Sequence, residues 1–214
     1  MSKIIIDQFI VGPVQTNCYF ATNSDTRETI VIDPGDSGTK LAELARELDC
    51  HPVAILLTHG HFDHTDGIKD FRDAFSDIKL EVYAHEDEKE LLADPSLNLS
   101  SDMGFGHQHY KADHFLKDGQ ILHMAGYDIT VLHTPGHTLG GVCYYIPEEG
   151  VLFSGDTLFC GSIGRTDFPN GSASQLINSI KEKCLTLPDD TKVYPGHDST
   201  TVIGDEKKYN FFLR

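Results

Sequence analysis

The stretch LLTHGHFDHTDG, residues 56–67, places three histidines and two aspartates directly after an apolar run. Imidazole and carboxylate groups crowded this closely repel or desolvate one another unless something compensates them. Three explanations are open: these side chains are exposed to solvent, they form a proton-transfer site, or they hold a metal ion. The spacing His59-x-His61-x-Asp63-His64 follows a run of strand length, and a loop anchored by a buried strand is a common position for a functional site.

Similar groups follow three other apolar runs. TPGH (134–137) and PGH (195–197) end in His137 and His197, and VLFSG (151–155) is followed by Asp156. Because packed strands can end at one sheet edge, we expect these side chains to converge on residues 59–64. Histidine nitrogens and carboxylate oxygens without thiolates suit Zn²⁺ and also iron or manganese. One HxH pair alone would be interpreted as an exposed loop, but the whole set favours a metal site.

Glycine adjoins a histidine at three of these places, Gly60, Gly136 and Gly196, where a missing Cβ permits a tight backbone path. Seven other histidines lack this spacing and are interpreted as surface or capping residues, with only His107 and His109 as lid candidates: His51, His85, His107, His109, His114, His123 and His133.

Composition narrows the setting. The chain has 214 residues, enough for one large domain or two small ones, and a formal net charge of −16. This charge argues against a nucleic acid or an anionic membrane surface as a partner. Apolar runs are too short for a membrane span, the N-terminus lacks the layout of a signal peptide, and five scattered cysteines suit a reducing compartment. We therefore expect a cytoplasmic protein.

Strands alternate with helices along the chain, which predicts a layered α/β or α+β domain. A buried strand is expected at 53–58, and the helix before it has Ser37 as its expected cap. Ser172 is the expected cap of a helix over 173–185. Residues 95–118 have no clear period and are expected to form a lid or binding loop. The other expected strands are 3–12, 17–22, 29–33, 80–85, 127–134, 140–147, 150–156 and 191–197, and the other expected helices are 68–75 and 86–93.

The motif series resembles that of the metallo-β-lactamase fold hydrolases. THGHFDH is followed by TPGHT, then FSGDT, then PGH, in the order typical of that superfamily, and TNCYF and VIDPG fit the same pattern. The segments FSGDTLFCGSIGRTDF and TPGHTLGGVCYY are most similar to the glyoxalase II-like branch, the relatives of hydroxyacylglutathione hydrolase. The resemblance covers about residues 12–198. It implies a single domain over residues 1–214, an αββα sandwich of two mixed sheets flanked by helices, without the C-terminal helical region of glyoxalase II proper.

The resemblance also implies a centre of two divalent metal ions, zinc above all, with iron or manganese as alternatives. His59, His61 and His137 would hold the first ion, Asp63, His64 and His197 the second, and Asp156 would bridge them. Asp63 and Asp156 are the carboxylates expected to act in catalysis, and Asp33 and Thr58 are expected to contact the ligating imidazoles. A hydroxide between the ions would attack the carbonyl of a thioester of the S-2-hydroxyacylglutathione type.

Arg165 and Phe168 are the residues that could contact the substrate. Arg165 could bind a substrate carboxylate or pair with Asp167 and fix the loop, and both explanations stay open. Phe168, with Phe105 and Tyr110, could line an apolar entrance, although aromatic residues in loops also pack against the body of a protein. The expected partner is thus a small-molecule thioester, whose acyl group and thiol carrier the sequence does not define. It does not define the oligomeric state either.

Other functions stay open. GRTDF also resembles the persulfide dioxygenases of this superfamily, which would hold a single iron through His59, His137 and Asp156. The presence of Asp63, His64 and His197 favours hydrolysis over that reaction. A β-lactamase is disfavoured by the lack of a secretion signal. A non-catalytic metal-binding domain would be expected to lack some of the seven ligands.

Overall fold

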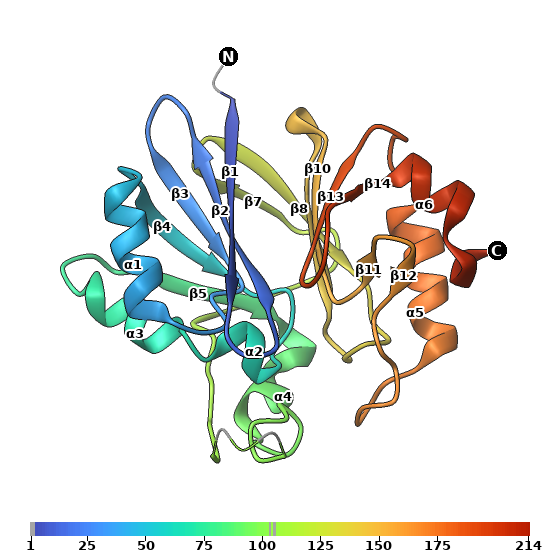
Figure 1. Ribbon diagram of the computed structural model, residues 1–214, viewed down its shortest axis with the longest axis horizontal. Helices are drawn as coiled ribbons and strands as arrows, with labels where there is room; N and C mark the ends of the chain where they lie inside the picture. The colour runs from blue at the N-terminus through green and yellow to red at the C-terminus, as the bar shows by residue number, and fades with distance from the viewer. Residues whose placement is uncertain (1–2, 103, 105) are drawn as a thin grey trace.

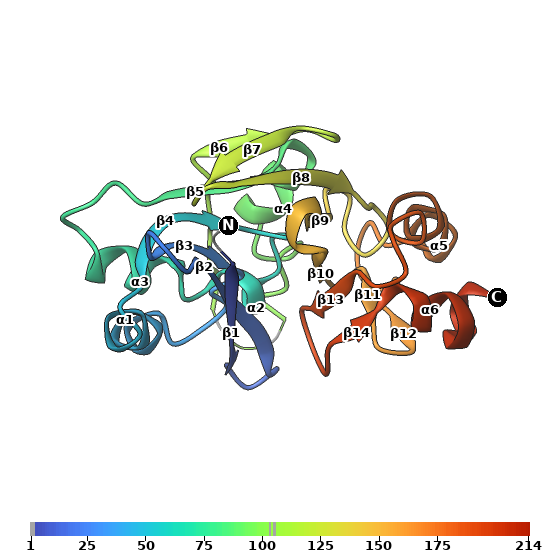
Figure 2. The ribbon, with the colours of Figure 1, turned by 90° about the horizontal axis from the view of Figure 1, so that it is seen from above.

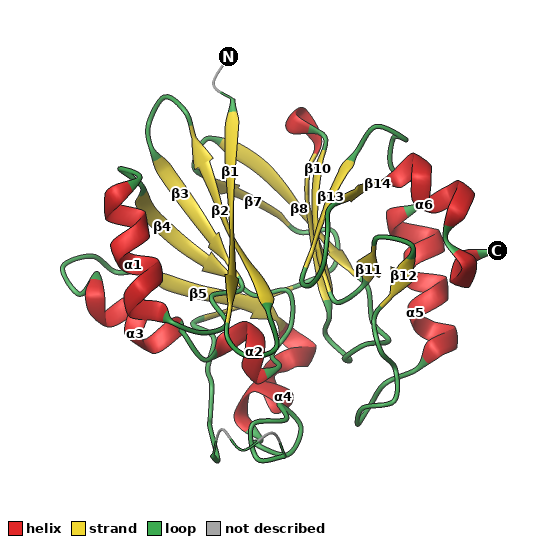
Figure 3. Cartoon of the chain, in the orientation of Figure 1, coloured by secondary structure: helices red, strands yellow, loops and turns green. Residues whose placement is uncertain are grey.

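Two mixed β-sheets lie face to face at the centre of the protein, and helices cover the outer face of each. The computed structural model describes residues 3–102, 104 and 106–214. In Figures 1 and 2 the helices α1 (Gly38–Glu47) and α3 (Ile68–Ala74) flank one sheet, and α5 (Ala173–Ser179) and α6 (Ile203–Tyr209) flank the other. Figure 3 shows the same four layers by type of element. The predicted αββα sandwich is confirmed.

The first sheet is antiparallel at one edge and parallel across the rest. Its strands β1 to β3 pair antiparallel, and β3 to β6 pair parallel. Two short helices, α2 and α4, follow its β4 and β5 strands. The bounds are β1 Ile4–Val11, β2 Thr16–Asn23, β3 Glu28–Ile32, β4 His51–Leu56, β5 Glu81–His85, β6 His114–Leu116, α2 Phe62–Thr65 and α4 Lys89–Ala93, with the 3-10 turn η1 Glu86–Glu88 between β5 and α4.

The second sheet has the spatial order β14-β13-β10-β9-β8-β7, in which only β10 and β13 pair parallel. A small ribbon, β11 with β12, follows β10. The bounds are β7 Ile121–Met124, β8 Tyr127–His133, β9 Val142–Ile146, β10 Val151–Gly155, β11 Leu158–Phe159, β12 Ser162–Ile163, β13 Lys192–Pro195 and β14 Thr201–Val202, with short turns η2 Pro147–Glu149, η3 Ile180–Cys184 and η4 Phe211–Leu213.

Strand β2 shows why both faces of the first sheet are apolar. Its side chains alternate, so that Phe20 packs under the helices with Phe71, while Tyr19 points between the sheets toward Phe153. A third apolar cluster, which includes Leu176, lies between the second sheet and its helices. Three apolar clusters therefore hold the four layers of secondary structure together. They also fix the positions of the strand ends that lead into the ligand-bearing loops.

Local details differ from the sequence-based expectations in three places. Ser172 caps α5 as predicted, because its Oγ accepts from the Gln175 N–H at 3.4 Å. Ser37 occupies the N-cap position of α1 as predicted, but its side chain forms no capping hydrogen bond: Ser37 has a φ of 54° and its hydroxyl donates to Asp36 instead. The helix predicted over 173–185 is α-helical only as far as Ser179, and residues 180–184 form one wider helical turn after it. The region 95–118, expected to be irregular throughout, includes strand β6.

Within the described residues, none of the helices has both the length and the apolar composition that a membrane crossing requires.

Candidate metal centre

The seven predicted ligands lie together although they come from both sheets. His59 and His61 follow β4, Asp63 and His64 lie in α2, His137 joins β8 to β9, and Asp156 and His197 follow β10 and β13. Among the described residues, their donor atoms form three groups within which all atoms lie within 4.8 Å of one another. The groups are His59, His61 and His137; His59, His64 and Asp156; and Asp63, His64 and His197.

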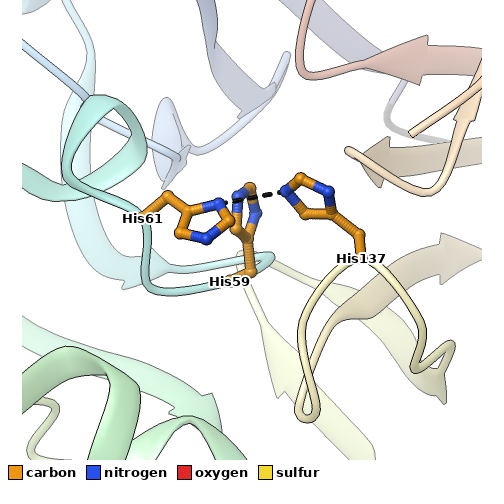
Figure 4. Close-up of side chains that lie close together, drawn as sticks. All are labelled: His59, His61 and His137. Atoms are coloured by element: carbon orange, nitrogen blue, oxygen red, sulfur yellow. Dashed lines mark hydrogen bonds between the residues drawn. The ribbon is translucent and has the colours of Figure 1, made fainter. Parts of the chain in front are cut away.

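The three-histidine group consists of buried imidazoles that lie close together (Figure 4). His61 Nδ1 lies 3.0 Å from His137 Nε2, and His137 Nδ1 donates to the Arg165 carbonyl at 2.7 Å. That donation leaves the His137 Nε2 lone pair directed into the group. Burial and the neighbouring histidines lower the pKa of His59, and burial and His137 lower the pKa of His61 to about 3. His59 and His61 are therefore uncharged at neutral pH, so each ring has one nitrogen with a free lone pair, as a metal ligand must have.

The second group mixes one carboxylate with two imidazoles. Asp63 Oδ2 lies 3.3 Å from His197 Nε2 and 3.5 Å from His64 Nε2, and it accepts from Thr16 Oγ1 at 2.8 Å. Burial lowers the pKa of His64, but Asp63, Asp156 and other carboxylates outweigh it and hold this pKa well above its usual value. Negative charge therefore dominates here, which favours a cation between the three side chains.

Asp156 lies between the two groups. Its Oδ1 is 3.4 Å from His64 Nε2, and its Oδ2 is 3.5 Å from His137 Nε2 and 3.6 Å from His197 Nε2. Burial opposes ionisation of this carboxyl, but His64, His197 and His137 together outweigh burial and hold the pKa of Asp156 well below its usual value. An ionised carboxylate whose oxygens lie near histidines of both groups has the position of a bridging ligand.

Three buried atoms of this centre have no hydrogen-bond partner: His59 Nε2, His64 Nε2 and Asp156 Oδ1. Buried polar atoms are nearly always paired, because an unpaired one costs about 1–3 kcal/mol. Asp156 Oδ1 and His59 Nε2 are electron-pair donors, and His64 Nε2 becomes one when a cation displaces its proton; other nitrogen and oxygen donors surround all three. The residues therefore fit a pair of divalent cations, and zinc, iron and manganese all accept this donor set.

Asp33 fixes the orientation of His64 directly and that of His59 through Thr58. It follows β3, is almost fully buried, and accepts from the Thr58 N–H at 2.8 Å and the Thr58 hydroxyl at 2.6 Å. His64 Nδ1 donates to the same carboxylate at 2.9 Å, and Thr58 Oγ1 also lies 3.1 Å from His59 Nδ1. One carboxylate therefore joins the end of β4 to α2 and directs His64 Nε2 toward the centre.

Aromatic and charged side chains border the centre. The Phe168 ring lies 5.5 Å from the His61 ring and 6.2 Å from the His137 ring. Arg165 is paired with both carboxylate oxygens of Asp167, at 3.0 and 2.8 Å, and its guanidinium lies 4.3 Å from the centre of the Phe168 ring. Of the two explanations for Arg165, the structure shows the ion pair with Asp167.

Tyr110, also expected at the entrance, is held by contacts of its own. Tyr110 packs against the first core cluster, and its hydroxyl donates to Asp66 at 2.9 Å. His109 contacts the carbonyl of Ala93. Phe105 lies outside the described residues.

Another group of three potential ligands, His85, Asp87 and His133, lies away from this centre. The rings of His85 and His133 stack 4.0 Å apart at an angle of 14°. Because the lone pairs of an imidazole lie in its ring plane, two parallel rings direct them side by side and not at one point. His85 instead accepts from the Asp87 N–H and so caps η1, in agreement with the capping role expected from the sequence.

Sequence reasoning missed two residues that shape the centre. Thr16 is the hydroxyl that donates to Asp63, and Glu88 contacts both histidine loops. Glu88 lies in a run of charged residues, EDEKE, which is typical of an exposed helix start. No local pattern distinguishes a buried glutamate in such a run from its exposed neighbours.

Comparison with known proteins agrees with the fold and the site. The sequence pattern of the Metallo-beta-lactamase superfamily matches residues 11–197, so the chain belongs to this superfamily of metallo-hydrolases. The probable metallo-hydrolase YqgX of Bacillus subtilis (strain 168) is 40% identical over 204 residues, which cover 95% of this chain and 94% of the relative. The hydroxyacylglutathione hydrolase GloC of Haemophilus influenzae (strain ATCC 51907 / DSM 11121 / KW20 / Rd) is 37% identical over 209 residues and covers 95% of both chains.

A solved structure is similar over nearly the whole chain. The B3 metallo-beta-lactamase BLEG-1 has a TM-score of 0.92 and 43% identity, with coverage of 98% of this chain and 99% of that one.

Proposed function

We propose that the protein is a metal-dependent hydrolase of thioesters of the S-2-hydroxyacylglutathione type. The observation that carries this proposal is the convergence of seven nitrogen and oxygen ligands, three of which have buried atoms without a partner. The similarity to GloC over 95% of both chains supports the choice of substrate class. Two bound divalent cations, most simply zinc, would supply an activated water molecule and polarise the carbonyl oxygen of the substrate.

The residues of the chain would contribute charge, orientation and shape. Asp63, whose pKa is about 2, and Asp156 are ionised at neutral pH, so both would contribute negative charge that holds and orients the cations and their activated water. Thr16 holds Asp63 in place by its hydrogen bond. Phe168 beside His61 and Phe159, whose ring lies 6.2 Å from His197, provide apolar surface near opposite ends of the centre, where an acyl group can pack.

The leaving group distinguishes a thioester from a β-lactam, the substrate class that the name of BLEG-1 suggests. In both reactions water adds to a carbonyl carbon. A thioester then loses its sulfur as a thiolate, which needs no proton, whereas the nitrogen of an amide must gain one. The carboxylates of this centre are held ionised and therefore have no proton to donate to a leaving nitrogen. This protonation state supports the thioester.

The test is a hydrolysis assay on protein loaded separately with zinc, iron(II) and manganese. S-lactoylglutathione, the same acyl group on other thiol carriers, and a chromogenic cephalosporin form the substrate panel. We expect cleavage of thioesters that His59→Ala or Asp156→Ala reduces at least about a thousandfold. Full activity in metal-stripped protein, or cleavage of the cephalosporin alone, would contradict the proposal.

Counting the metals on the same sample tests the alternative reaction. One iron per chain, with oxygen uptake on a persulfide, would favour the dioxygenase. The second group of Asp63, His64 and His197 supports two ions per chain.

A further inference from the structure

Glu88 is a carboxylate buried completely inside the protein. It accepts three hydrogen bonds: from the Gly60 N–H at 2.7 Å, the Thr138 hydroxyl at 2.6 Å and the Gly140 N–H at 2.8 Å. Among the described residues no lysine, arginine or histidine forms a salt bridge with it. A buried charge is costly unless other groups compensate it, and a chain that retains one gains something specific from it.

The three donors belong to the two loops that supply the three-histidine group. Gly60 lies between His59 and His61, after β4 of the first sheet. Thr138 and Gly140 follow His137, between β8 and β9 of the second sheet. The two oxygens of the Glu88 side chain therefore connect the two loops by hydrogen bonds. Figure 4 shows the imidazoles of the same two loops lying close together.

The loops also pack directly against the segment that carries Glu88. A Cβ on Gly140 would lie 2.6 Å from the Glu88 backbone nitrogen, and a Cβ on Gly60 would lie 2.8 Å from a Leu91 methyl group. Neither loop can therefore move toward Glu88, and the hydrogen bonds prevent movement away from it. The separation of the two loops is set from both directions.

We propose that Glu88 is a positioning residue that fixes His59 and His61 relative to His137, so that one ion reaches all three nitrogens. Metal–nitrogen bonds of about 2.0–2.1 Å leave little tolerance for a shift of either loop. The proposal rests on the metal centre proposed above and not on the identity of the substrate. Its readout is metal affinity, so it can succeed or fail whether or not thioesters are cleaved.

Glu88→Gln is the sharpest substitution, because the amide has nearly the same shape. A glutamine offers one accepting oxygen and one donating NH₂ group. Whichever way it is turned, the NH₂ group faces the N–H of Gly60 or that of Gly140, and two donors face each other. One loop must then move away.

Glu206 provides a matched control. It is a nearly fully buried carboxylate in α6 that accepts from a backbone N–H (Gly161), a threonine hydroxyl (Thr201, 2.7 Å) and a side-chain amide (Asn210, 2.7 Å). Glu206 shares with Glu88 a backbone N–H donor and a threonine hydroxyl donor and differs in having a side-chain amide as the third; none of its donors belongs to a loop of the three-histidine group. Glu206→Gln therefore measures the general effect of removing a buried carboxylate.

The experiment measures Zn²⁺ affinity by competition with a chromogenic chelator, in a His197→Ala background that leaves the three-histidine group intact. We expect Glu88→Gln to weaken Zn²⁺ binding by about 10–100-fold and to reduce the rise in Tm on zinc loading. Glu206→Gln should lower the Tm of loaded and stripped protein equally and leave the affinity within about twofold of the parent. Equal affinity losses in both variants, or none in Glu88→Gln, would overturn the proposal.

Thr138→Val keeps the test decisive if Glu88→Gln does not fold. It removes one of the three hydrogen bonds and nearly preserves shape. We expect Zn²⁺ affinity to fall by about 2–10-fold, the range for one lost hydrogen bond. An unchanged affinity in Thr138→Val would equally overturn the proposal.

Discussion

At the scale of single residues, the centre depends on side chains that hold the ligands as much as on the ligands themselves. Asp33 shows this most clearly, since its two oxygens accept from the Thr58 N–H, the Thr58 hydroxyl and His64 Nδ1. These bonds select the tautomer of His64 that presents Nε2 to the centre.

Asp33→Asn tests this role. The amide group replaces one accepting oxygen with a donor, so at least one of the three bonds is lost. We expect the affinity of the second metal ion to fall by about 10–100-fold, measured by competition titration. Asp36→Asn, in the same turn but partly exposed, should leave the affinity unchanged. An equal effect of the two substitutions would show that Asp33 serves the turn and not the histidine.

The charge balance around His64 predicts how metal-stripped protein responds to pH. The raised pKa of His64 means that its interaction with Asp63 and Asp156 stabilises the fold fully below pH 6.5. That stability is lost as the pH rises through the raised pKa. For Asp63, whose pKa falls from 3.8 to about 2, stability is present above pH 3.8 and is lost as the pH falls toward 2.

We therefore expect the Tm of stripped protein to be highest near pH 6.5 and to fall on both sides. Below pH 6.5 the unfolded chain takes up protons at His59 and His61, whose pKa values are lowered in the folded protein, and above pH 6.5 the proton on His64 is progressively lost. Loaded protein should not show the alkaline fall, because cations replace the proton on His64. Thermal melts of both forms on both sides of this pH provide the measurement. Parallel alkaline falls in the two forms would refute the prediction.

At the scale of elements, short turns carry ligands within contact distance of each other. Gly196 precedes His197 at the end of β13, and a Cβ there would lie 2.3 Å from Asp156 Oδ1 and 2.7 Å from His64 Cε1. The absence of a side chain is therefore a steric requirement of the centre.

Gly196→Ala should displace Asp156 or His64 and weaken metal binding at least about tenfold, measured by metal content after dialysis against a chelator. Gly150→Ala is the control: its φ is +61°, so alanine is strained there, but the added Cβ meets nothing within 4 Å. It should cost about 1–2 kcal/mol of stability and leave metal content unchanged. Metal retention in Gly196→Ala would contradict the steric argument.

The strands and the ligand-bearing loops were predictable because both have local signals. Apolar runs such as 53–58 mark the strands, and histidines directly after them mark the loops. Glu88 was not predictable, because its burial depends on Gly60 and Gly140, which lie 28 and 52 residues away. The absence of a side-chain capping bond from Ser37 was not predictable for a similar reason. Tight packing of Gly35 against the backbone of Asp63 shapes that turn, and this contact has no signal in the local sequence.

At the scale of the whole molecule, both metal groups cross the boundary between the two sheets. His59, His61, Asp63 and His64 come from the first sheet, while His137, Asp156 and His197 come from the second. Bound ions would therefore hold the halves of the sandwich together and stabilise the folded state relative to the unfolded chain.

We expect chelation of the ions to lower the Tm by at least about 5 °C. An ion at 100 times its Kd contributes about 2.7 kcal/mol, and each kcal/mol shifts Tm by about 2–4 °C in a protein of this size. Differential scanning calorimetry with and without chelator measures the shift, and His123→Gln, at an exposed surface position, serves as a control that should show the same shift as the parent. A Tm that does not respond to chelation would contradict coupling of the halves through the ions.

The split origin of the ligands also bears on biosynthesis. A ribosome makes the chain from its N-terminus, so His59, His61, Asp63 and His64 emerge together and early. Neither cation can gain its third ligand of the groups described above until residue 137 or residue 197 has been translated and the second sheet has docked. Capture of both ions is therefore a late event in the maturation of this polypeptide, and a nascent fragment that stops short of His137 has only two of the three ligands of each group to offer the metal pool of the cell.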